Sequence, residues 1–145
     1  MLKLIPVSED NWREDLEVFD HQKHYVADRA ALLARAYAYR RCRSRAFVVC
    51  DDEIPVGMAL YYDAPELEAY IFSQLFIDRR YQRRGYGRQA AALVLRAMRR
   101  DGRYPRVSLC CLSDNEVGLR FYRSLGFERR PDMDDGDEWV LERAL

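Results

Sequence analysis

The 145 residues of the chain match the size of one ordinary domain and leave little room for a second one. Hydrophobic residues form 49% and charged residues 33% of the sequence, which excludes a disordered chain and predicts a globular protein with a buried core. No apolar run is long enough to cross a bilayer or to form a signal peptide, so we expect a cytoplasmic protein without a membrane partner.

The formal net charge is +0, but the charges are segregated along the chain. Residues 79–106 contain ten arginines and a single acid, Asp101, whereas residues 131–138 contain five acids and no base. Guanidinium groups suit bidentate contacts with phosphate, and they serve equally well as the solvated face of a helix. The sequence does not indicate what the acidic segment does.

No metal site is expected. His21 and His24 lie three residues apart and could share a helix face, but no third ligand with suitable spacing accompanies them. The cysteines show no Cys-x-x-Cys spacing, which predicts reduced thiols rather than a zinc ribbon or a disulfide framework. The four cysteines are Cys42, Cys50, Cys110 and Cys111.

Hydrophobic periodicity and turn residues predict alternating strands and helices along the whole chain. In the first half we expect a strand at about 2–5, a polar helix starting at Ser8 or Glu9 with Trp12, Leu16 and Phe19 on one face, a helix at about 26–40, a hairpin of strands at 46–50 and 56–62, and a strand at about 68–77. In the second half we expect a helix at about 87–100 that stops at Asp101-Gly102, a strand at 107–112, a helix that follows the capping box 113–116 and ends at Gly126, and strands at 127–130 and 138–143. This order predicts an α/β protein, with a mixed sheet that carries helices on its faces.

The segment Gln82-Arg83-Arg84-Gly85-Tyr86-Gly87 lies between a predicted strand and a predicted helix. The first turn of a helix has free N–H groups and the positive end of the helix dipole, and glycines let the backbone approach a phosphate closely. The segment has neither the Gly-Lys-Ser/Thr of a Walker A loop nor the third glycine of a dinucleotide-binding loop. It therefore predicts a site for an anionic group such as a pyrophosphate, the alternative being a glycine turn with solvated arginines.

Two ordered motifs resemble those of the GNAT superfamily of N-acetyltransferases. Residues 82–87 follow an apolar strand and are similar to the family's acetyl-coenzyme A loop, Gln/Arg-x-x-Gly-x-Gly/Ala. Residues 115–127 are similar to its later segment Asn-x-x-Ala-x-x-Phe-Tyr-x-x-x-Gly-Phe, with Gly118 where alanine is usual. The resemblance extends essentially from end to end. It implies a single N-acetyltransferase domain over residues 1–145, with the GNAT acyl-CoA N-acyltransferase fold, a central and mostly antiparallel sheet flanked by about four helices.

The resemblance implies acetyl-coenzyme A as the co-substrate and no metal. Backbone groups around Phe76 and Ile77 are expected to pair with the pantetheine arm, and Asn115 is expected to hydrogen-bond to it. Arg88 is expected to assist the backbone amides that receive the pyrophosphate. Those amides belong to Gln82, Arg83, Arg84, Gly85, Tyr86 and Gly87.

The resemblance also places Tyr122 near the thioester sulfur. A phenol with a pKa of about 10 is protonated at neutral pH and can donate to the departing thiolate, although Tyr122 could instead be a packed helix tyrosine. The attacking amine needs a base, for which Glu68 acting through water is our first candidate. Asp63 and Glu66 are further candidates, and each of the three could equally be a solvated turn acid.

Several segments look like the bacterial spermine/spermidine acetyltransferase subgroup, which implies a linear polyamine as the acceptor. Acidic and aromatic groups should then line its channel. Gln74 departs from the subgroup, which commonly has arginine there. The resembling residues are Gln22–Ala27, Leu32, Leu33, Ala36, Tyr37, Ile77, Asp78, Tyr81, Gln82 and Met133–Gly136, and the groups available to line the channel are Asp20, Asp63, Glu66, Glu68, Tyr61 and Tyr62.

Other functions remain open at this point. A GNAT enzyme of the same fold could acetylate a protein N-terminus, a lysine, an aminoglycoside or another small amine. A domain without catalysis could bind coenzyme A only, and the arginine-rich stretch would also suit a nucleic-acid-binding module, whose binding would depend steeply on salt. The resemblance further implies a homodimer as one assembly, because dimers are frequent in the superfamily.

Overall fold

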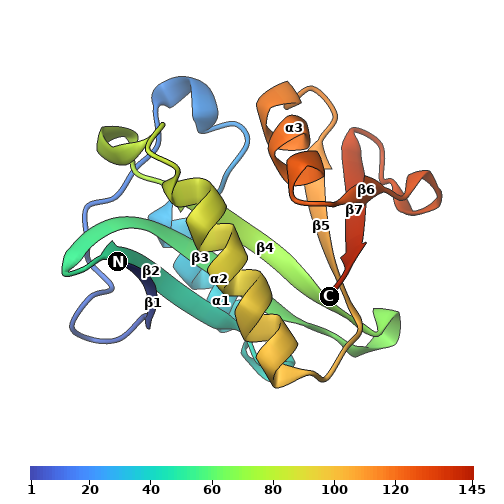
Figure 1. Ribbon diagram of the computed structural model, residues 1–145, viewed down its shortest axis with the longest axis horizontal. Helices are drawn as coiled ribbons and strands as arrows, with labels where there is room; N and C mark the ends of the chain where they lie inside the picture. Colours follow the sequence, from blue (N-terminus) through green and yellow to red (C-terminus); the bar gives the residue numbers. More distant parts are fainter.

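The computed structural model describes all 145 residues and contains one seven-stranded sheet with three α-helices. The strands lie side by side in the order β1-β2-β3-β4-β5-β7-β6 (Figure 1). None of the helices has the length and apolar character that crossing a membrane requires. The elements are β1 (Leu2–Pro6), α1 (Arg29–Ala38), β2 (Arg45–Asp51), β3 (Ile54–Ala64), β4 (Ala69–Ile77), α2 (Tyr86–Asp101), β5 (Arg106–Leu112), α3 (Glu116–Ser124), β6 (Glu128–Arg129) and β7 (Glu138–Ala144).

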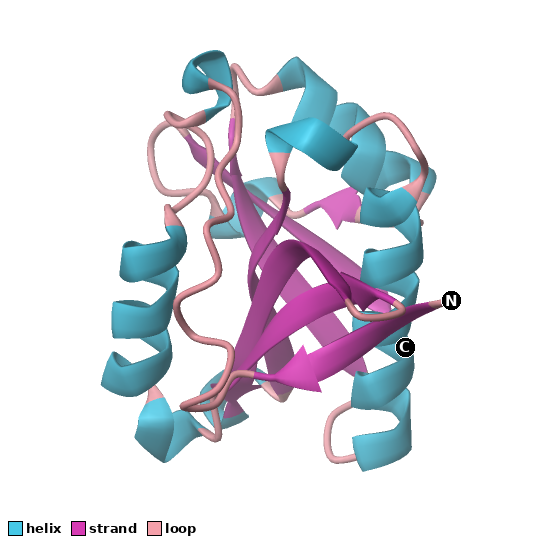
Figure 2. Ribbon diagram, turned by 90° about the vertical axis from the view of Figure 1, so that its left-hand side faces the viewer, coloured by secondary structure: helices cyan, strands magenta, loops and turns pink.

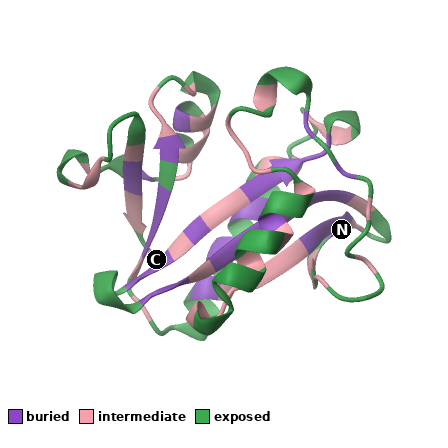
Figure 3. Ribbon diagram, turned by 180° about the vertical axis from the view of Figure 1, so that it is seen from behind, coloured by how far each residue is buried: buried purple, intermediate pink, exposed green.

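Each face of the sheet has its own hydrophobic core. Helix α1 packs against β2 and β3 on one face, and α2 packs against β1, β3 and β4 on the other (Figure 2). The core on the α2 side includes Tyr70, Phe72 and Leu75 of β4, whereas the core on the α1 side includes Phe76 of the same strand. No helix covers β5 and β7 on the α1 side (Figure 3).

All neighbouring strands are antiparallel except β4 and β5, which run parallel. These two strands pair only from Ala69–Arg106 to Ile71–Ser108 and then diverge. The register of β4 against β3 also shifts, because Tyr61 pairs with Phe72 and Leu60 with Gln74, which leaves Ser73 as the extra residue of a bulge. The second half of β4 therefore has a partner strand on one side only, and we call the opening between β4 and β5 the β4–β5 gap.

The mixed sheet confirms the fold expected from the sequence, but one predicted helix is absent. Residues 8–19 form turns and an extended segment instead of a helix, so the sheet has three α-helices rather than four. The N–H group of Glu17 donates to Asp78 Oδ2 over 2.9 Å, and the carbonyl of Glu17 accepts from Arg79 N–H over 2.9 Å. These bonds hold the segment extended, so that Leu16 and Val18 are both buried although they lie two residues apart.

A cluster of charges joins the end of α2 to β2 and β3. Asp63 is only 4% exposed and lies 2.6 Å from Arg43 and 2.9 Å from Arg45. Arg43 also contacts Asp101 over 2.8 Å, and Tyr70 donates its hydroxyl hydrogen to the same carboxylate. The hydrogen bonds from Arg43 and Tyr70 lower the pKa of Asp101 well below its usual range. This cluster lies beside the closed end of the β4–β5 gap.

We predict that Asp101→Asn lowers the free energy of unfolding at pH 7 by about 1 to 2 kcal/mol, because two charge-assisted contacts are lost at a partly solvated site. The depressed pKa means that the carboxylate stabilises the fold fully above an unfolded pKa of about 3.9, and less as the pH falls below it. Urea unfolding at pH 7, 5 and 3 should show the difference from wild type shrinking at pH 3. The exposed Asp10→Asn serves as the control. A difference that stays constant down to pH 3 would contradict this account.

Candidate functional site

The free edge of β4 forms one wall of the candidate site. Asp78 N–H donates to the carbonyl of Val56 in a 2.8 Å hydrogen bond, which fixes the direction of alternate backbone groups in this part of β4. Phe76 consequently turns its N–H and C=O toward β3, whereas Leu75 and Ile77 turn theirs toward the β4–β5 gap. The pairing of this strand with a pantetheine arm remains a prediction for Phe76 and Ile77, and the direction of the backbone groups favours Ile77 together with Leu75.

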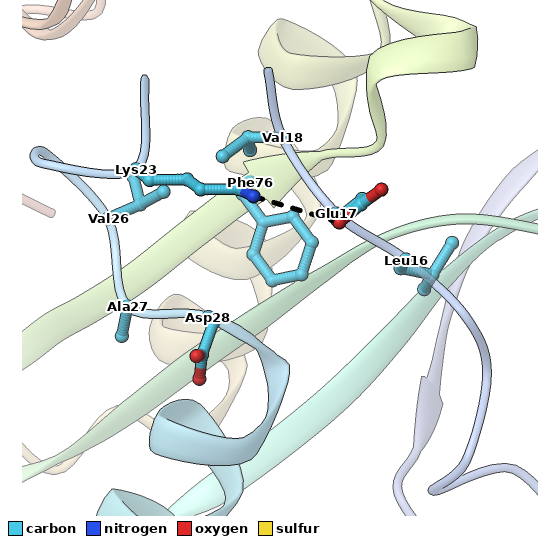
Figure 4. A pocket seen from close by; sticks show the side chains of 8 residues that line it. All are labelled: Leu16, Glu17, Val18, Lys23, Val26, Ala27, Asp28 and Phe76. Atoms are coloured by element: carbon cyan, nitrogen blue, oxygen red, sulfur yellow. Dashed lines mark ion pairs between the residues drawn. The ribbon is translucent and has the colours of Figure 1, made fainter. Parts of the chain in front are cut away.

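The side chain of Phe76 lines a cavity on the α1 side of the sheet rather than the β4–β5 gap (Figure 4). Its volume is about 240 Å³, below the range of about 300 to 1,000 Å³ that is usual for drug-sized ligands. Lys23 and Glu17 face each other over 3.9 Å at this cavity. The cavity includes neither the glycine loop nor Tyr122, so it is not the centre of the site. Its lining residues are Leu16, Glu17, Val18, Lys23, Val26, Ala27, Asp28 and Phe76.

The glycine loop presents a continuous run of unpaired backbone donors. Helix α2 begins at Tyr86, and none of the N–H groups from Gln82 to Arg88 donates a hydrogen bond within the protein. Arg83 and Gly85 have positive φ angles of 63° and 82°. Where left-handed residues alternate with right-handed ones, successive N–H groups point toward one concave site that can bind an anion. A Cβ atom on Gly85 would meet only Gln89 Nε2, at 3.8 Å, so the space in front of the loop is open. The predicted residues are therefore brought together as backbone donors.

The side chains of the same loop are largely committed elsewhere. Arg88 bonds to the hydroxyl of Ser124 over 2.9 Å and to its carbonyl over 3.3 Å, so it ties α2 to the end of α3. The Tyr86 hydroxyl donates to Asp51 over 2.6 Å. Arg83 and Arg84 are exposed and form no ion pair. Arg84 donates to the carbonyl of Arg80 over 3.4 Å, which leaves Arg83 as the side chain free to add positive charge in front of the run of N–H groups.

Tyr122 lies in an aromatic cluster between α3 and β4. Its ring packs edge-on against Phe72, Phe121 and Phe127, at centroid distances of 6.3, 5.1 and 5.7 Å. Burial raises the pKa of the Tyr122 phenol, so the group stays protonated at neutral pH. Its hydroxyl has no partner within the protein and is not sealed from solvent. The structure thus offers a neutral, unengaged proton donor here.

Asn115 caps the first turn of α3, with its Oδ1 accepting from Gly118 N–H over 3.0 Å. A Cβ atom at position 118 would collide with the Asn115 amide in this orientation. Glycine in place of the usual alanine therefore leaves room for the cap. The Asn115 side chain hydrogen-bonds to the Cys111 thiol, and its Nδ2 group donates to no oxygen of the protein.

The structure does not bring Glu68 together with Tyr122. Glu68 ends the short turn Pro65–Leu67 with a φ of 50°, and its side chain is 78% exposed and 3.7 Å from Arg106. It lies at the closed end of the β4–β5 gap, and four residues of extended strand, about 13 Å, separate it from Phe72. Its role as a base through water stays a prediction. Of the other proposed acids, Asp63 is engaged with arginines and Asp20 with Lys23 over 2.8 Å, whereas Glu66 is exposed and forms no ion pair.

An acidic and aromatic surface that the sequence did not place lies on the uncovered side of β5. Cys110 is exposed there, and partial desolvation together with the negative charges of Glu138, Asp135 and Asp134 raises the pKa of its thiol. Glu138 is brought close because β7 pairs with β5, so that Leu112 lies opposite Glu138. On the other side of β4, beside its part that pairs with β5, Tyr39 and Tyr62 stack with centroids 4.1 Å apart. The acidic run was visible in the sequence, but its position depends on strand order. We call Tyr39, Tyr62, Cys110, Asp135 and Glu138 the acceptor-side surface.

Comparison with known proteins agrees with this arrangement. The model of the acetyltransferase (GNAT) family matches residues 6–127. A spermine/spermidine N(1)-acetyltransferase of Bacillus subtilis (strain 168) is 26% identical over 96 residues, which span 62% of this chain and 63% of that protein, less than two thirds of its length. An acetyltransferase of Thermus thermophilus superimposes with a TM-score of 0.80 at 21% identity, covering 100% of this chain and 97% of that one.

A spermidine N-acetyltransferase of Vibrio cholerae, solved with coenzyme A and spermine, superimposes with a TM-score of 0.78 at 16% identity, covering 99% of this chain and 95% of that one. At such low identities the structural likenesses show the fold alone. The family model, by contrast, covers both the strand-to-helix loop and the Asn115–Phe127 segment. On that ground the chain belongs to the acetyltransferase (GNAT) family.

Proposed function

We propose that the 145-residue chain acts as one N-acetyltransferase domain that moves the acetyl group of acetyl-coenzyme A to a primary amine, with a polyamine such as spermidine or spermine as the acceptor. The observation that carries the proposal is the run of unpaired N–H groups from Gln82 to Arg88. The first turn of a helix leaves its N–H groups without backbone partners at the positive end of the helix dipole, and a diphosphate supplies acceptors for several of them at once. Acetyl-coenzyme A supplies the activated thioester.

The residues around the β4–β5 gap fit the remainder of that co-substrate. Leu75 and Ile77 direct backbone groups into the gap, as an extended amide-containing arm requires. The Nδ2 group of Asn115 and the hydroxyl of Tyr122 are both donors without an oxygen partner in the protein. The exception among the backbone groups is the Ile77 carbonyl, which accepts from Gln82 Nε2 over 2.9 Å.

Tyr122 has the chemistry of a general acid for the leaving thiolate. As the bond from the amine nitrogen to the carbonyl carbon forms and the carbon–sulfur bond breaks, the sulfur gains one proton and the amine nitrogen loses one. Tyr122 supplies the first proton. Water accepts the second, with Glu68 as our first candidate for the carboxylate that receives it further away.

The acceptor-side surface favours a polycation. Asp135 and Glu138 form no ion pair within the protein, so their charges remain available to ammonium groups. The stacked Tyr39 and Tyr62 offer aromatic faces for cation–π contacts. The match to the Bacillus subtilis spermine/spermidine enzyme supports the same class of acceptor.

A nucleic-acid-binding module is less well supported. Four of the arginines in the basic stretch are held by carboxylates of the protein itself: Arg79 by Glu17, Arg80 by Asp78, Arg103 by Asp63 and Arg106 by Glu68. Arg88 is bonded to Ser124. The stretch therefore does not form a continuous free basic face of the kind that backbone contacts with nucleic acid need.

Coenzyme A should raise the melting temperature of the wild-type protein in a saturable manner, and pantetheine, which lacks the diphosphate, should not do so at the same concentration. Gly85→Ala should weaken coenzyme A binding about tenfold, because a Cβ is strained at φ 82° and shifts the backbone that holds the run of N–H groups in place. Isothermal titration measures both dissociation constants.

The matched control is Gly102→Ala at the other end of α2, where φ is 65° and a Cβ would meet only ordinary contacts. This control should lose similar stability and keep wild-type affinity. If both variants bind coenzyme A as tightly as wild type, the diphosphate does not sit on the glycine loop.

Tyr122→Phe should lower kcat by about 100-fold or more, since general acid catalysis contributes on that scale, and should leave the dissociation constant of coenzyme A unchanged. Because burial raises the pKa of Tyr122, the wild-type kcat should show no loss from tyrosine ionisation up to about pH 9. Thiol release measured from pH 6 to 9 tests both points. Tyr37→Phe, at an exposed tyrosine, is the control. Equal rates in Tyr122→Phe and wild type would indicate that the domain binds coenzyme A without using this tyrosine.

Neutralising the acceptor-side surface should weaken the use of polyamines specifically. We expect Asp135→Asn with Glu138→Gln to raise KM for spermidine about tenfold and to leave KM for acetyl-coenzyme A unchanged, because only the amine carries positive charge. Asp137→Asn, a charge change within the same loop, is the control. Thiol release should be compared across spermidine, spermine, putrescine, aminoglycosides, amino acids and basic peptides. A wild-type enzyme that prefers an uncharged or singly charged amine would contradict the polyamine assignment.

A further inference from the structure

One short segment crosses the β4–β5 gap on the α1 side. Residues Gln22–Ala27 run between the short turn Arg79–Tyr81 and helix α3 (Figure 1). We call them the crossing segment. Its middle reaches the far side of the gap, where the Tyr25 hydroxyl lies 3.5 Å from the carbonyl of Asp114. Its end is held on the near side, where Ala27 N–H donates to Gln74 Oε1 over 3.0 Å.

The start of the crossing segment is bonded to the first residue of the glycine loop. Gln22 Nε2 donates to Gln82 Oε1 over 3.0 Å, and Gln82 Nε2 donates back to Gln22 Oε1 over 2.8 Å. Gln82 Nε2 also donates to the carbonyl of Ile77 over 2.9 Å. The two amides thus form a reciprocal pair at the end of β4.

The pair is built to hold Gln22 in one orientation. Phe19 N–H donates to Gln22 Oε1 over 3.2 Å, so this oxygen accepts from both Phe19 N–H and Gln82 Nε2. Upstream, the buried carboxylate of Asp78 bonds to Glu17 N–H and to Arg80, and these bonds lower its pKa despite its burial. Asp78 therefore fixes the chain before Gln22. The amide pair, in contrast, joins Gln22 to Gln82, the residue at which the run of unpaired N–H groups begins.

We infer that Gln22 is a positioning residue that couples the crossing segment to the phosphate loop, so that occupation of the loop also orders the segment in front of the β4–β5 gap. The inference rests on the proposed function. Ligand contacts at the backbone of Gln82 restrict its side chain, and the reciprocal amide pair passes that restriction to Gln22 and onward to Tyr25 and Ala27. Coenzyme A would then help to form the wall along which the amine approaches.

Hydrogen exchange with and without coenzyme A tests the coupling without any need to know the amine. In the wild type, coenzyme A should slow exchange in peptides covering 82–88 and also in peptides covering 20–27. In Gln22→Ala the slowing at 82–88 should persist and the slowing at 20–27 should be lost. Gln22→Glu keeps the acceptor for Phe19 and Gln82, so it should retain part of the effect. His21→Ala, in the same turn, should behave as wild type.

Each other outcome overturns the inference in a recognisable way. If coenzyme A slows exchange at 20–27 equally in wild type and Gln22→Ala, the segment responds by another route. If it slows only 82–88 in the wild type, the segment does not respond at all. If it slows neither region in the wild type, the proposed function fails and the inference with it. Gln22 is only half-buried, and a melting curve of each variant confirms that loss of coupling is not loss of folding.

Discussion

The parting of β4 from β5 after three paired positions is the constraint on which the site depends. Two parallel strands in the middle of a sheet would ordinarily satisfy each other's backbone groups over their full length. Here the second half of each strand lacks that partner. The Ile77 carbonyl accepts from Gln82 Nε2, while the Leu75 backbone groups and the Ile77 N–H group must bond to solvent or to a ligand. Helix α3 and the aromatic cluster around Tyr122 occupy the α2 side of the opening, so that the strands stay apart.

Around the glycine loop, most arginine side chains stabilise the fold, while backbone N–H groups are left free to bind an anion. Most of the arginines that flank the glycine loop are neutralised by nearby carboxylates or bonded to a helix end, as with Arg80 and Asp78 or Arg88 and Ser124. The concave run of N–H groups between them carries no such partner. An anion in this place would be held chiefly by fixed backbone dipoles, which lose little conformational freedom on binding.

The sequence predicted the elements whose pattern is local and missed features that depend on distant contacts. Helix α2 and the strands around it follow from apolar spacing, and the glycine loop follows from its place between strand and helix. The missing helix at residues 8–19 is explained by Asp78, which lies about sixty residues away and bonds to Glu17. The direction of the Phe76 backbone groups depends on the pairing of Phe76 with Met58. Which residues lie near Glu138 depends on the pairing of β7 with β5. No periodicity within a short window contains this information.

The bulge at Ser73 determines where β4 can lose a residue without exchanging the side chains on its two faces. Since Tyr61 pairs with Phe72 and Leu60 with Gln74, Ser73 is one residue more than the ladder to β3 uses. Loss of that residue would straighten the strand yet keep Phe72 and Phe76 in their separate cores. Loss of a residue elsewhere in the strand would exchange inward and outward side chains along one half of it. A deletion in this strand is thus compatible with both cores at Ser73, and that position adjoins the opening where β4 leaves β5.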